Sequence, residues 1–164
     1  MKHLEKIKAR DLMSKIIEAQ IETGQPYMLY KDSINNKSNQ KNIGVIKSSN
    51  LCAEIVEYSD KNETSVCNLA SIALPKFVKK SDKKLIYDYD ALYETAKLAT
   101  KNLDEVIDIN FYPTDKTERS NNKHRPIGLG IQGLADVYFK LGIAYDSEEA
   151  CLLYTSDAAD DIGR

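Results

Sequence analysis

The chain has 164 residues, of which 42% are hydrophobic and 29% charged, and its formal net charge is -2. This length and composition are typical of one globular domain, and the near-balanced charge gives no electrostatic footprint for nucleic acid or an acidic membrane surface. No apolar run is long enough to span a bilayer, and the first ten residues lack the apolar core of a signal peptide, so a cytoplasmic location is expected.

The N-terminal third is predicted to hold one helix, then a short strand and a loop. Residues 4–22 carry an apolar stripe at helical spacing, made of Leu12, Met13, Ile16, Ile17 and Ile21. Gly24 suits the C-cap of this helix, and Pro26 cannot continue it. Residues 27–30 predict a short strand, and an Asn-, Ser- and Lys-rich loop at a surface or cleft follows to about residue 42.

The middle of the chain is predicted to contain two apolar segments and a long helix. Residues 50–58 are the next extended segment, whereas residues 65–74 form a mostly apolar run that suits either a strand or a helix. Residues 89–110 keep one helical face apolar through Leu92, Ala96, Ala99, Leu103, Val106 and Ile107. Asp88 or Asp90 can cap the start of this helix.

The C-terminal third completes an alternation of strands and helices. Residues 121–142 are predicted to form a loop, a short strand and a third helix that stops at Gly142. The alternation indicates an α/β arrangement. Residues 128–133, "GLGIQG", match the dinucleotide fingerprint only weakly, because the preceding segment is basic and contains a proline. The alternative is close packing at a strand-to-helix turn.

The polar face of the extended segment 50–58 is the first candidate site. Successive side chains of an extended chain point to opposite faces. One face then carries Asn50, Cys52 and Glu54, and the other carries Leu51, Ala53 and Ile55. An amide, a thiol and a carboxylate on one edge form a plausible active-site group, although they also suit a solvated face.

The chemistry of this group depends on its thiol. A nearby carboxylate opposes thiolate formation, which argues against a cysteine protease with a paired histidine. The arrangement suits a thiol kept protonated, or used as a radical, beside a carboxylate that acts as a base. Taken alone, Cys52 and Cys67 would each suit a buried structural role.

The cysteines and histidines do not predict a metal site or a disulfide framework. Cys52, Cys67 and Cys151 lack C-x-x-C spacing, and the two histidines, His3 and His124, lie far apart in sequence. No metal is therefore expected in this chain.

Three separate stretches resemble one family. Residues 22–60, "ETGQPYMLYKDSINNKSNQKNIGVIKSSNLCAEIVEYSD", residues 65–74, "SVCNLASIAL", and residues 124–142, "HRPIGLGIQGLADVYFKLG", carry the likeness. They closely resemble the large, catalytic subunit of class I ribonucleoside-diphosphate reductase. This family reduces ribonucleoside diphosphates to 2′-deoxyribonucleoside diphosphates for DNA synthesis.

The resemblance implies a role for each matching residue. Cys52 corresponds to the cysteine that becomes a thiyl radical and removes the 3′ hydrogen of the ribose. Glu54 corresponds to the carboxylate that accepts the 3′-hydroxyl proton, and Asn50 to the amide that hydrogen-bonds the sugar, so that Asn50, Leu51, Cys52 and Glu54 contact substrate. Cys67 corresponds to one of two redox-active cysteines that supply electrons and end as a disulfide.

The family also implies a fold and partners. Its fold is a helix-rich, ten-stranded α/β barrel, of which residues 1–150 would be part. The radical comes from a separate small subunit with a di-iron tyrosyl centre, so no cofactor is expected in this fragment. A large-subunit homodimer, ATP and dNTP effectors, and thioredoxin or glutaredoxin are the other implied partners. Because the second redox cysteine and the radical path lie elsewhere, the isolated fragment is expected to be inactive.

Residues 151–164 depart from the family pattern. "CLLYTSDAADDIGR" matches the translation of a common sequencing adapter, so we expect a non-native tail from Cys151 onward; a genuine variant C-terminus is the alternative. Two other functions stay open. One is a non-catalytic homologue that binds nucleotide or the small subunit, and the other is a cobalamin-dependent reductase with the same chemistry.

Overall fold

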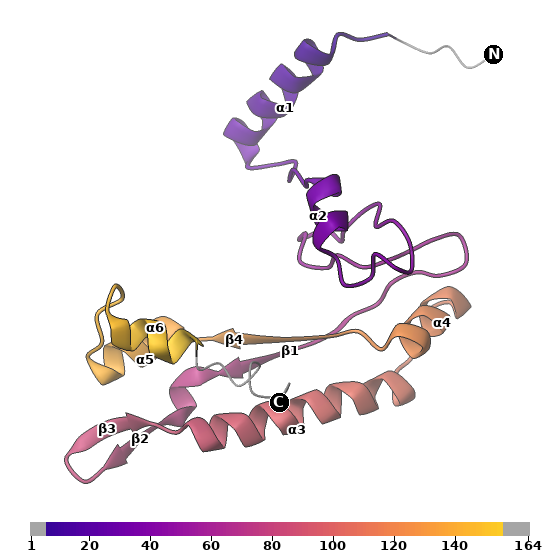
Figure 1. Ribbon diagram of the computed structural model, residues 1–164. Coiled ribbons are helices and arrows are strands. Elements are labelled where there is room, and N and C mark those ends of the chain that lie inside the picture. Colours follow the sequence, from indigo (N-terminus) through magenta and orange to yellow (C-terminus); the bar gives the residue numbers. More distant parts are fainter. Residues whose placement is uncertain (1–5, 156–164) are drawn as a thin grey trace. The chain divides into compact units, whose positions relative to one another are not determined.

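The structure is a computed structural model that describes residues 6–155. It divides into an N-terminal unit, Met1–Asp60, and a C-terminal unit, Lys61–Arg164 (Figure 1). Among the described residues, no helix has the length and apolar character that crossing a membrane requires.

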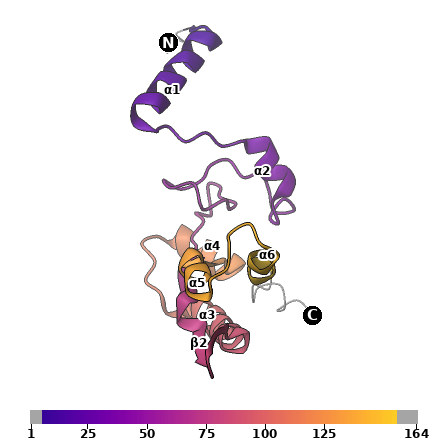
Figure 2. The ribbon, with the colours of Figure 1, turned by 90° about the vertical axis from the view of Figure 1, so that its left-hand side faces the viewer.

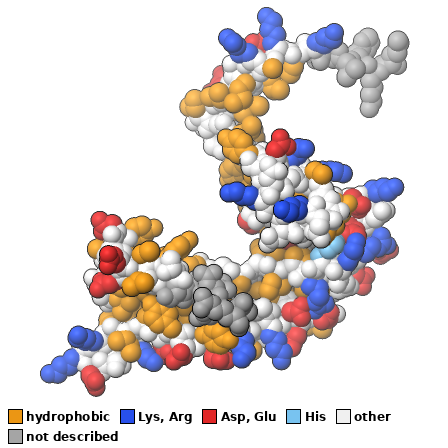
Figure 3. Space-filling view, in the orientation of Figure 1, with side chains coloured by type: hydrophobic (Ala, Val, Ile, Leu, Met, Phe, Trp, Pro, Cys, Tyr) orange, Lys and Arg blue, Asp and Glu red, His pale blue; other side chains and the backbone are white. Residues whose placement is uncertain are grey.

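The N-terminal unit contains two helices joined by an irregular segment (Figure 2). Helix α1 spans Ala9–Thr23 and ends at Gly24, whose φ of 75° lies in the left-handed region, so the predicted helix and its glycine cap are confirmed. The helix begins later than predicted, because the described residues before Ala9 are not helical. Four residues of its apolar stripe are exposed, namely Leu12, Met13, Ile17 and Ile21, and Figure 3 shows hydrophobic side chains over α1 and the segment that follows it.

Two predictions for this unit are wrong. Residues 27–30 do not form a strand, and the predicted loop that follows them begins with helix α2, Lys31–Lys37. A tertiary contact explains α2. The Asn35 side chain accepts from the backbone N–H of Ile46 at 2.8 Å and donates to its carbonyl at 2.9 Å. Ile46 is buried, so this helix is held by a partner that lies beyond any local sequence window.

The C-terminal unit contains the strands of the described residues. Strand β1, Asn68–Ala73, pairs in parallel with β4, Ile127–Gln132, and the register runs from Asn68 opposite Ile127 to Ala73 opposite Gln132. The undecided run at residues 65–74 is therefore largely a strand. A 3-10 helix, η1 (Leu74–Phe77), links β1 to an antiparallel hairpin of β2 (Val78–Ser81) and β3 (Lys84–Tyr87).

The helices of this unit among the described residues are α3 (Tyr89–Ile109), α4 (Asp115–His124), α5 (Leu134–Leu141) and α6 (Glu148–Thr155). Helix α3 lies against the parallel pair, and α3, α5 and α6 contribute residues to the core. Helix α3 runs alongside β1 and β4 (Figure 1), and the Asp88 side chain caps it by accepting from the N–H of Ala91 at 3.2 Å, so the predicted helix and cap are confirmed. The buried core cluster comprises Ile72, Leu74, Leu92, Ala96, Val137, Tyr138, Ala150 and Leu153.

The predicted α/β arrangement is confirmed, with one correction near residue 121. The first part of the segment 121–142 belongs to α4 rather than to a loop, because Thr114 and Thr117 form a capping box that starts this helix. Strand β4, helix α5 and the left-handed Gly142 then follow in the predicted order.

The glycines of "GLGIQG" do not form a phosphate-binding loop. Gly128 and Gly130 lie within β4, and Gly133 is the residue before α5. A Cβ on Gly133 would lie 2.7 Å from ring atoms of Pro75, and its φ is 80°. Close packing at a strand-to-helix turn, the alternative considered above, therefore describes this segment.

The predicted boundary after Ala150 falls inside α6. Cys151–Thr155 form the end of that helix, and Leu153 belongs to the buried core cluster. Residues 156–164 lie outside the described residues, so the non-native tail stays a prediction.

Candidate functional site

The residues around Cys52 form a tight turn instead of the predicted extended segment. The backbone N–H of Ala53 donates to the carbonyl of Asn50 at 3.2 Å, and Ala53 has a φ of 66°. Leu51 is 90% exposed, so the expected division into a buried apolar face and a polar face is wrong.

Local side-chain hydrogen bonds explain the turn. The Asn50 Oδ1 atom accepts from the N–H of Ile55 at 3.0 Å, and the Ser49 hydroxyl donates to the carbonyl of Ile55 at 2.6 Å. Asn and Ser side chains often compete with strand pairing in this way. Because Asn50 Oδ1 is occupied by the backbone, its Nδ2 group is the end available to donate to a ligand.

The turn places an amide, a thiol and a carboxylate within five consecutive residues, and its thiol borders a cavity. This cavity is a shallow hollow, largely open to solvent, with a volume of about 490 Å³, and it lies within the N-terminal unit. It is lined by Gln20, Gly24, Pro26, Tyr27, Met28, Leu29, Cys52 and Ala53. Cys52 is exposed and not part of a disulfide, and Glu54 is also exposed. Sequence reasoning did not predict the wall formed by residues 24–29.

The end of α1 positions the wall formed by residues 24–29. The Gln20 side chain donates to the carbonyl of Pro26 at 2.8 Å, which ties the segment after the helix back to its last turns. The break at Gly24 and Pro26 is visible in the sequence, whereas its position opposite Cys52 depends on the fold.

Cys67 belongs to the C-terminal unit, directly before β1, and it is half-buried. Its sulfur lies against β4, because a Cβ built on Gly128 would be 3.6 Å from Cys67 Sγ. The turn with Asn50, Cys52 and Glu54 belongs to the other unit. The proposed roles of these residues stay predictions.

A buried carboxylate four residues before Cys67 in the sequence was missed by sequence reasoning. Glu63 is 8% exposed, and it accepts from Lys123 Nζ at 2.5 Å and from His124 Nε2 at 2.7 Å. These hydrogen bonds, with that from Lys123 the stronger influence, hold the pKa of the Glu63 carboxyl below its ordinary value. In the sequence, the lysine-rich context of both segments is typical of a solvated surface.

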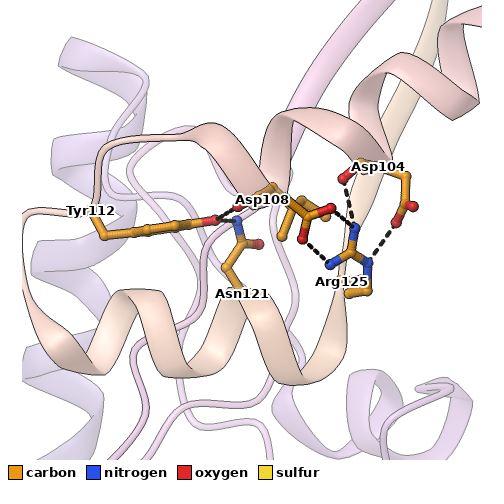
Figure 4. A network of polar contacts seen from close by, with 6 residues as sticks. Asp104, Asp108, Tyr112, Asn121 and Arg125 are labelled. Atoms are coloured by element: carbon orange, nitrogen blue, oxygen red, sulfur yellow. Dashed lines mark hydrogen bonds and ion pairs between the residues drawn. The ribbon is translucent and has the colours of Figure 1, made fainter.

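A second polar network fixes the end of α4 (Figure 4). Arg125 has a φ of 47° and caps α4 in the left-handed region. Its Nε atom donates to Asp104 Oδ1 at 2.7 Å, and its Nη1 and Nη2 atoms donate to the Asp108 carboxylate at 2.7 and 3.0 Å. In the same network Asn121 Nδ2 donates to the Tyr112 hydroxyl at 2.6 Å. This network ties the start of β4 to the end of α3.

The described residues contain no cluster of three or more His, Cys, Asp or Glu side chains arranged to hold a metal ion.

Comparison with known proteins gives consistent matches. The family model described as "Ribonucleotide reductase, barrel domain" matches residues 1–158. The chain is 56% identical over 148 residues to the ribonucleoside-diphosphate reductase large subunit of Acanthamoeba polyphaga mimivirus, covering 90% of this chain and 17% of that protein. It is 58% identical over 146 residues to large chain 2 of the Saccharomyces cerevisiae enzyme, covering 88% of this chain and 17% of that protein.

A plant relative with the same name also matches the chain. The ribonucleoside-diphosphate reductase large subunit of Arabidopsis thaliana is 48% identical over 160 residues, which covers 88% of this chain and 20% of that protein. The chain thus spans a fifth or less of the length of these curated relatives.

Proposed function

The chain belongs to the ribonucleotide reductase barrel-domain family, and from this premise we propose that it is a catalytic segment of a ribonucleoside-diphosphate reductase large subunit. The observation that carries the proposal is the turn at residues 50–54. It carries an amide, a thiol and a carboxylate within five consecutive residues, and the thiol borders a cavity. Below, "the full-length subunit" means the large subunit that contains this segment.

In the proposed reaction Cys52 begins the chemistry as a thiyl radical. Its sulfur takes the hydrogen atom from C3′ of the ribose, and the same atom returns to C3′ at the end of the cycle. Glu54 accepts the 3′-hydroxyl proton, which requires a carboxylate within hydrogen-bond reach of that hydroxyl. Asn50 donates from Nδ2 to the sugar, because its Oδ1 is held by the backbone N–H of Ile55.

Cys67 and a second cysteine outside this chain supply the electrons. The C2′–O bond breaks, the oxygen leaves as water, and a hydrogen takes its place at C2′. Two thiols lose two electrons and two protons and become one disulfide. Overall, a ribonucleoside diphosphate and a dithiol give a 2′-deoxyribonucleoside diphosphate, a disulfide and water.

The geometry of the turn suits this use of Cys52. A hydrogen-abstracting sulfur must be held close to the carbon that it attacks. The left-handed Ala53 turns the chain directly after Cys52, and the hydrogen bonds of Asn50 and Ser49 close the loop around it. A short, internally bonded turn holds the thiol more firmly than an open loop.

Several partners follow from the proposal. A small subunit with a di-iron tyrosyl centre generates the radical, and a thioredoxin or glutaredoxin reduces the disulfide. A second large subunit forms the homodimer, and ATP and dNTP effectors regulate it. Because disulfide reduction by these dithiol proteins requires a reducing compartment, we place the enzyme in the cytoplasm.

The test uses the full-length subunit assembled with its small subunit. We expect Cys52→Ser and Glu54→Gln each to abolish deoxyribonucleotide formation while nucleotide binding, measured by calorimetry, stays close to wild type. Ser48→Ala, which removes an exposed hydroxyl beside the turn, is the control and should retain activity. Near wild-type turnover in either the Cys52 or the Glu54 variant would refute the proposal.

A further inference from the structure

The segment that leads into Cys67 is fastened to α4 and to the residues that follow it. Glu63 binds Lys123 and His124 at the C-terminal end of that helix. Three further hydrogen bonds involve backbone groups. The Thr64 N–H donates to the Lys116 carbonyl at 3.2 Å, and the Asn68 N–H donates to the Pro126 carbonyl at 3.5 Å. The Arg119 side chain donates from Nη1 to the Asn62 carbonyl at 3.1 Å. A loop of this kind is usually mobile, but this one is held along its length.

Glu63 is the buried anchor of this attachment. Its side chain is 10% exposed, as is that of His124, whereas that of Lys123 is 55% exposed. Burying a carboxylate is unfavourable unless charged or hydrogen-bonding partners compensate, and here both of its oxygens have one. Because a carboxylate can only accept, His124 Nε2 carries the donated hydrogen. Removing the charge of Glu63 therefore removes the attraction that holds the Lys123 and His124 side chains against the loop.

Cys67 lies between this anchor and the start of the sheet. The β1–β4 ladder begins at the next residue, where Asn68 faces Ile127. The ladder thus fixes the chain after Cys67, and Glu63 fixes the chain before it. On the β4 side, the Cys67 sulfur lies beside Gly128, at van der Waals distance (3.6 Å) from the position that a Cβ would take there.

We propose that Glu63 is a positioning residue for Cys67, which holds the approach to β1 through Lys123 and His124 so that the Cys67 sulfur stays beside Gly128. This inference rests on the proposed redox role of Cys67. Thiol–disulfide exchange requires the attacking and attacked sulfurs to meet in line, so a loosened Cys67 would exchange electrons slowly. Glu63 itself does not touch substrate in this mechanism.

The main test is Glu63→Gln in the full-length subunit with its small subunit, since this change keeps the side-chain volume and removes the charge. We expect kcat with a dithiol reductant to fall about tenfold or more, because misplacement of reacting groups by 1 Å lowers rates by up to about 100-fold. The KM for the ribonucleoside diphosphate should not change. The rate at which iodoacetamide alkylates Cys67 should change at least several-fold, and that of Cys52 should not.

Asp88→Asn is the matched control. It makes the same carboxylate-to-amide change in the same unit, at a residue that accepts from Lys79 Nζ at 2.7 Å, but at the N-cap of α3 instead of in the loop before Cys67. Its turnover and its Cys67 alkylation should match wild type. Equal effects of Glu63→Gln and Asp88→Asn, or parallel changes at Cys67 and Cys52, would overturn the proposal.

A second variant covers the case in which Glu63→Gln does not fold. Lys123→Gln removes a partner whose side chain is mostly exposed and leaves the bond from His124 in place. We expect a smaller change of Cys67 alkylation and kcat in the same direction, and no change at all would overturn the proposal. Failure of the redox assignment is recognised separately, because Cys67→Ser would then retain multiple turnover whatever Glu63 does.

Discussion

Arg125 and Asp108 form a two-pronged ion pair between the cap of α4 and the last turns of α3, with nitrogen–oxygen distances of 2.7 and 3.0 Å. The same guanidinium group also binds the side chain and the backbone carbonyl of Asp104, each at 2.7 Å. A planar guanidinium matches this fork, whereas a lysine ammonium does not.

We therefore expect Arg125→Lys to lower the apparent melting temperature of the full-length subunit by a few degrees. The charge is retained, but the bidentate geometry is lost. Lys15→Arg is the control, because Lys15 makes a single exposed contact with Glu18 on α1. Equal melting temperatures for Arg125→Lys and wild type would contradict the prediction.

Acid should weaken the attachment of the Cys67 loop. The pKa of Glu63 is lowered by its hydrogen bonds with Lys123 and His124, so the unfolded state binds more protons than the folded state. The resulting stabilisation is fully present above the ordinary glutamate pKa of 4.5 and is lost as the pH falls through the lowered value.

The measurement is the apparent urea midpoint of the full-length subunit between pH 7 and pH 3. Wild type should lose stability below about pH 4.5, and Glu63→Gln should show a flatter profile in that window. Glu18→Gln on α1 serves as the control for removal of one carboxylate. Superimposable profiles for Glu63→Gln and Glu18→Gln would show that the Glu63 carboxylate contributes nothing specific to the acid dependence of stability.

Gly128 should control access to Cys67. An alanine Cβ there would lie 2.5 Å from Leu69 Cδ2 and 3.6 Å from Cys67 Sγ. Leu69 is 57% exposed, so the end of its side chain can rotate away at little cost, whereas the new methyl group stays against the sulfur. We expect Gly128→Ala to slow alkylation of Cys67 several-fold with little loss of stability.

Gly130→Ala is the matched control on the same strand, since its Cβ would meet only the Ala70 carbonyl at 3.9 Å. Mass spectrometry of alkylated peptides measures both variants. An unchanged alkylation rate in Gly128→Ala would mean that the space beside this glycine does not govern the thiol.

Alanine substitutions at Gly133 and Gly24 distinguish the effect of backbone strain from that of steric crowding. Both have left-handed φ values, 80° and 75°, so alanine costs roughly 1–2 kcal/mol at either position. At Gly133 the Cβ would also lie 2.7 Å from the Pro75 ring, whereas at Gly24 nothing lies within 4 Å. We expect Gly133→Ala to lower the apparent melting temperature clearly more than Gly24→Ala does, and equal shifts would contradict this packing.

The sequence predicted those elements whose signals are local. Helix α3 follows from its apolar stripe and from Asp88, which caps it as expected. Helix α2 was missed because Asn35 acts through Ile46, eleven residues away. The undecided run that became β1 gave no alternation of apolar and polar residues, because its more buried face begins with the polar Asn68 and its exposed face carries the apolar Leu69.

At the candidate site, too, the sequence predicted what depends on local signals and missed what depends on tertiary contacts. Asn50, Cys52, Glu54 and Cys67 were identifiable from their residue types and their resemblance to a family. Their geometry was not, because the turn depends on hydrogen bonds from Ser49 and Asn50 and on a left-handed alanine. Glu63 was missed since its partners lie about sixty residues further along the chain.

The parallel pairing of β1 with β4 also sets an order of events during synthesis. Cys67 leaves the ribosome before Gly128, the residue against which its sulfur packs. At translation speeds of about 5–20 residues per second, roughly 3–12 s separate the two. During that interval the thiol has no strand beside it, so the nascent chain depends on a reducing environment, or on a chaperone, to keep the thiol from reacting prematurely.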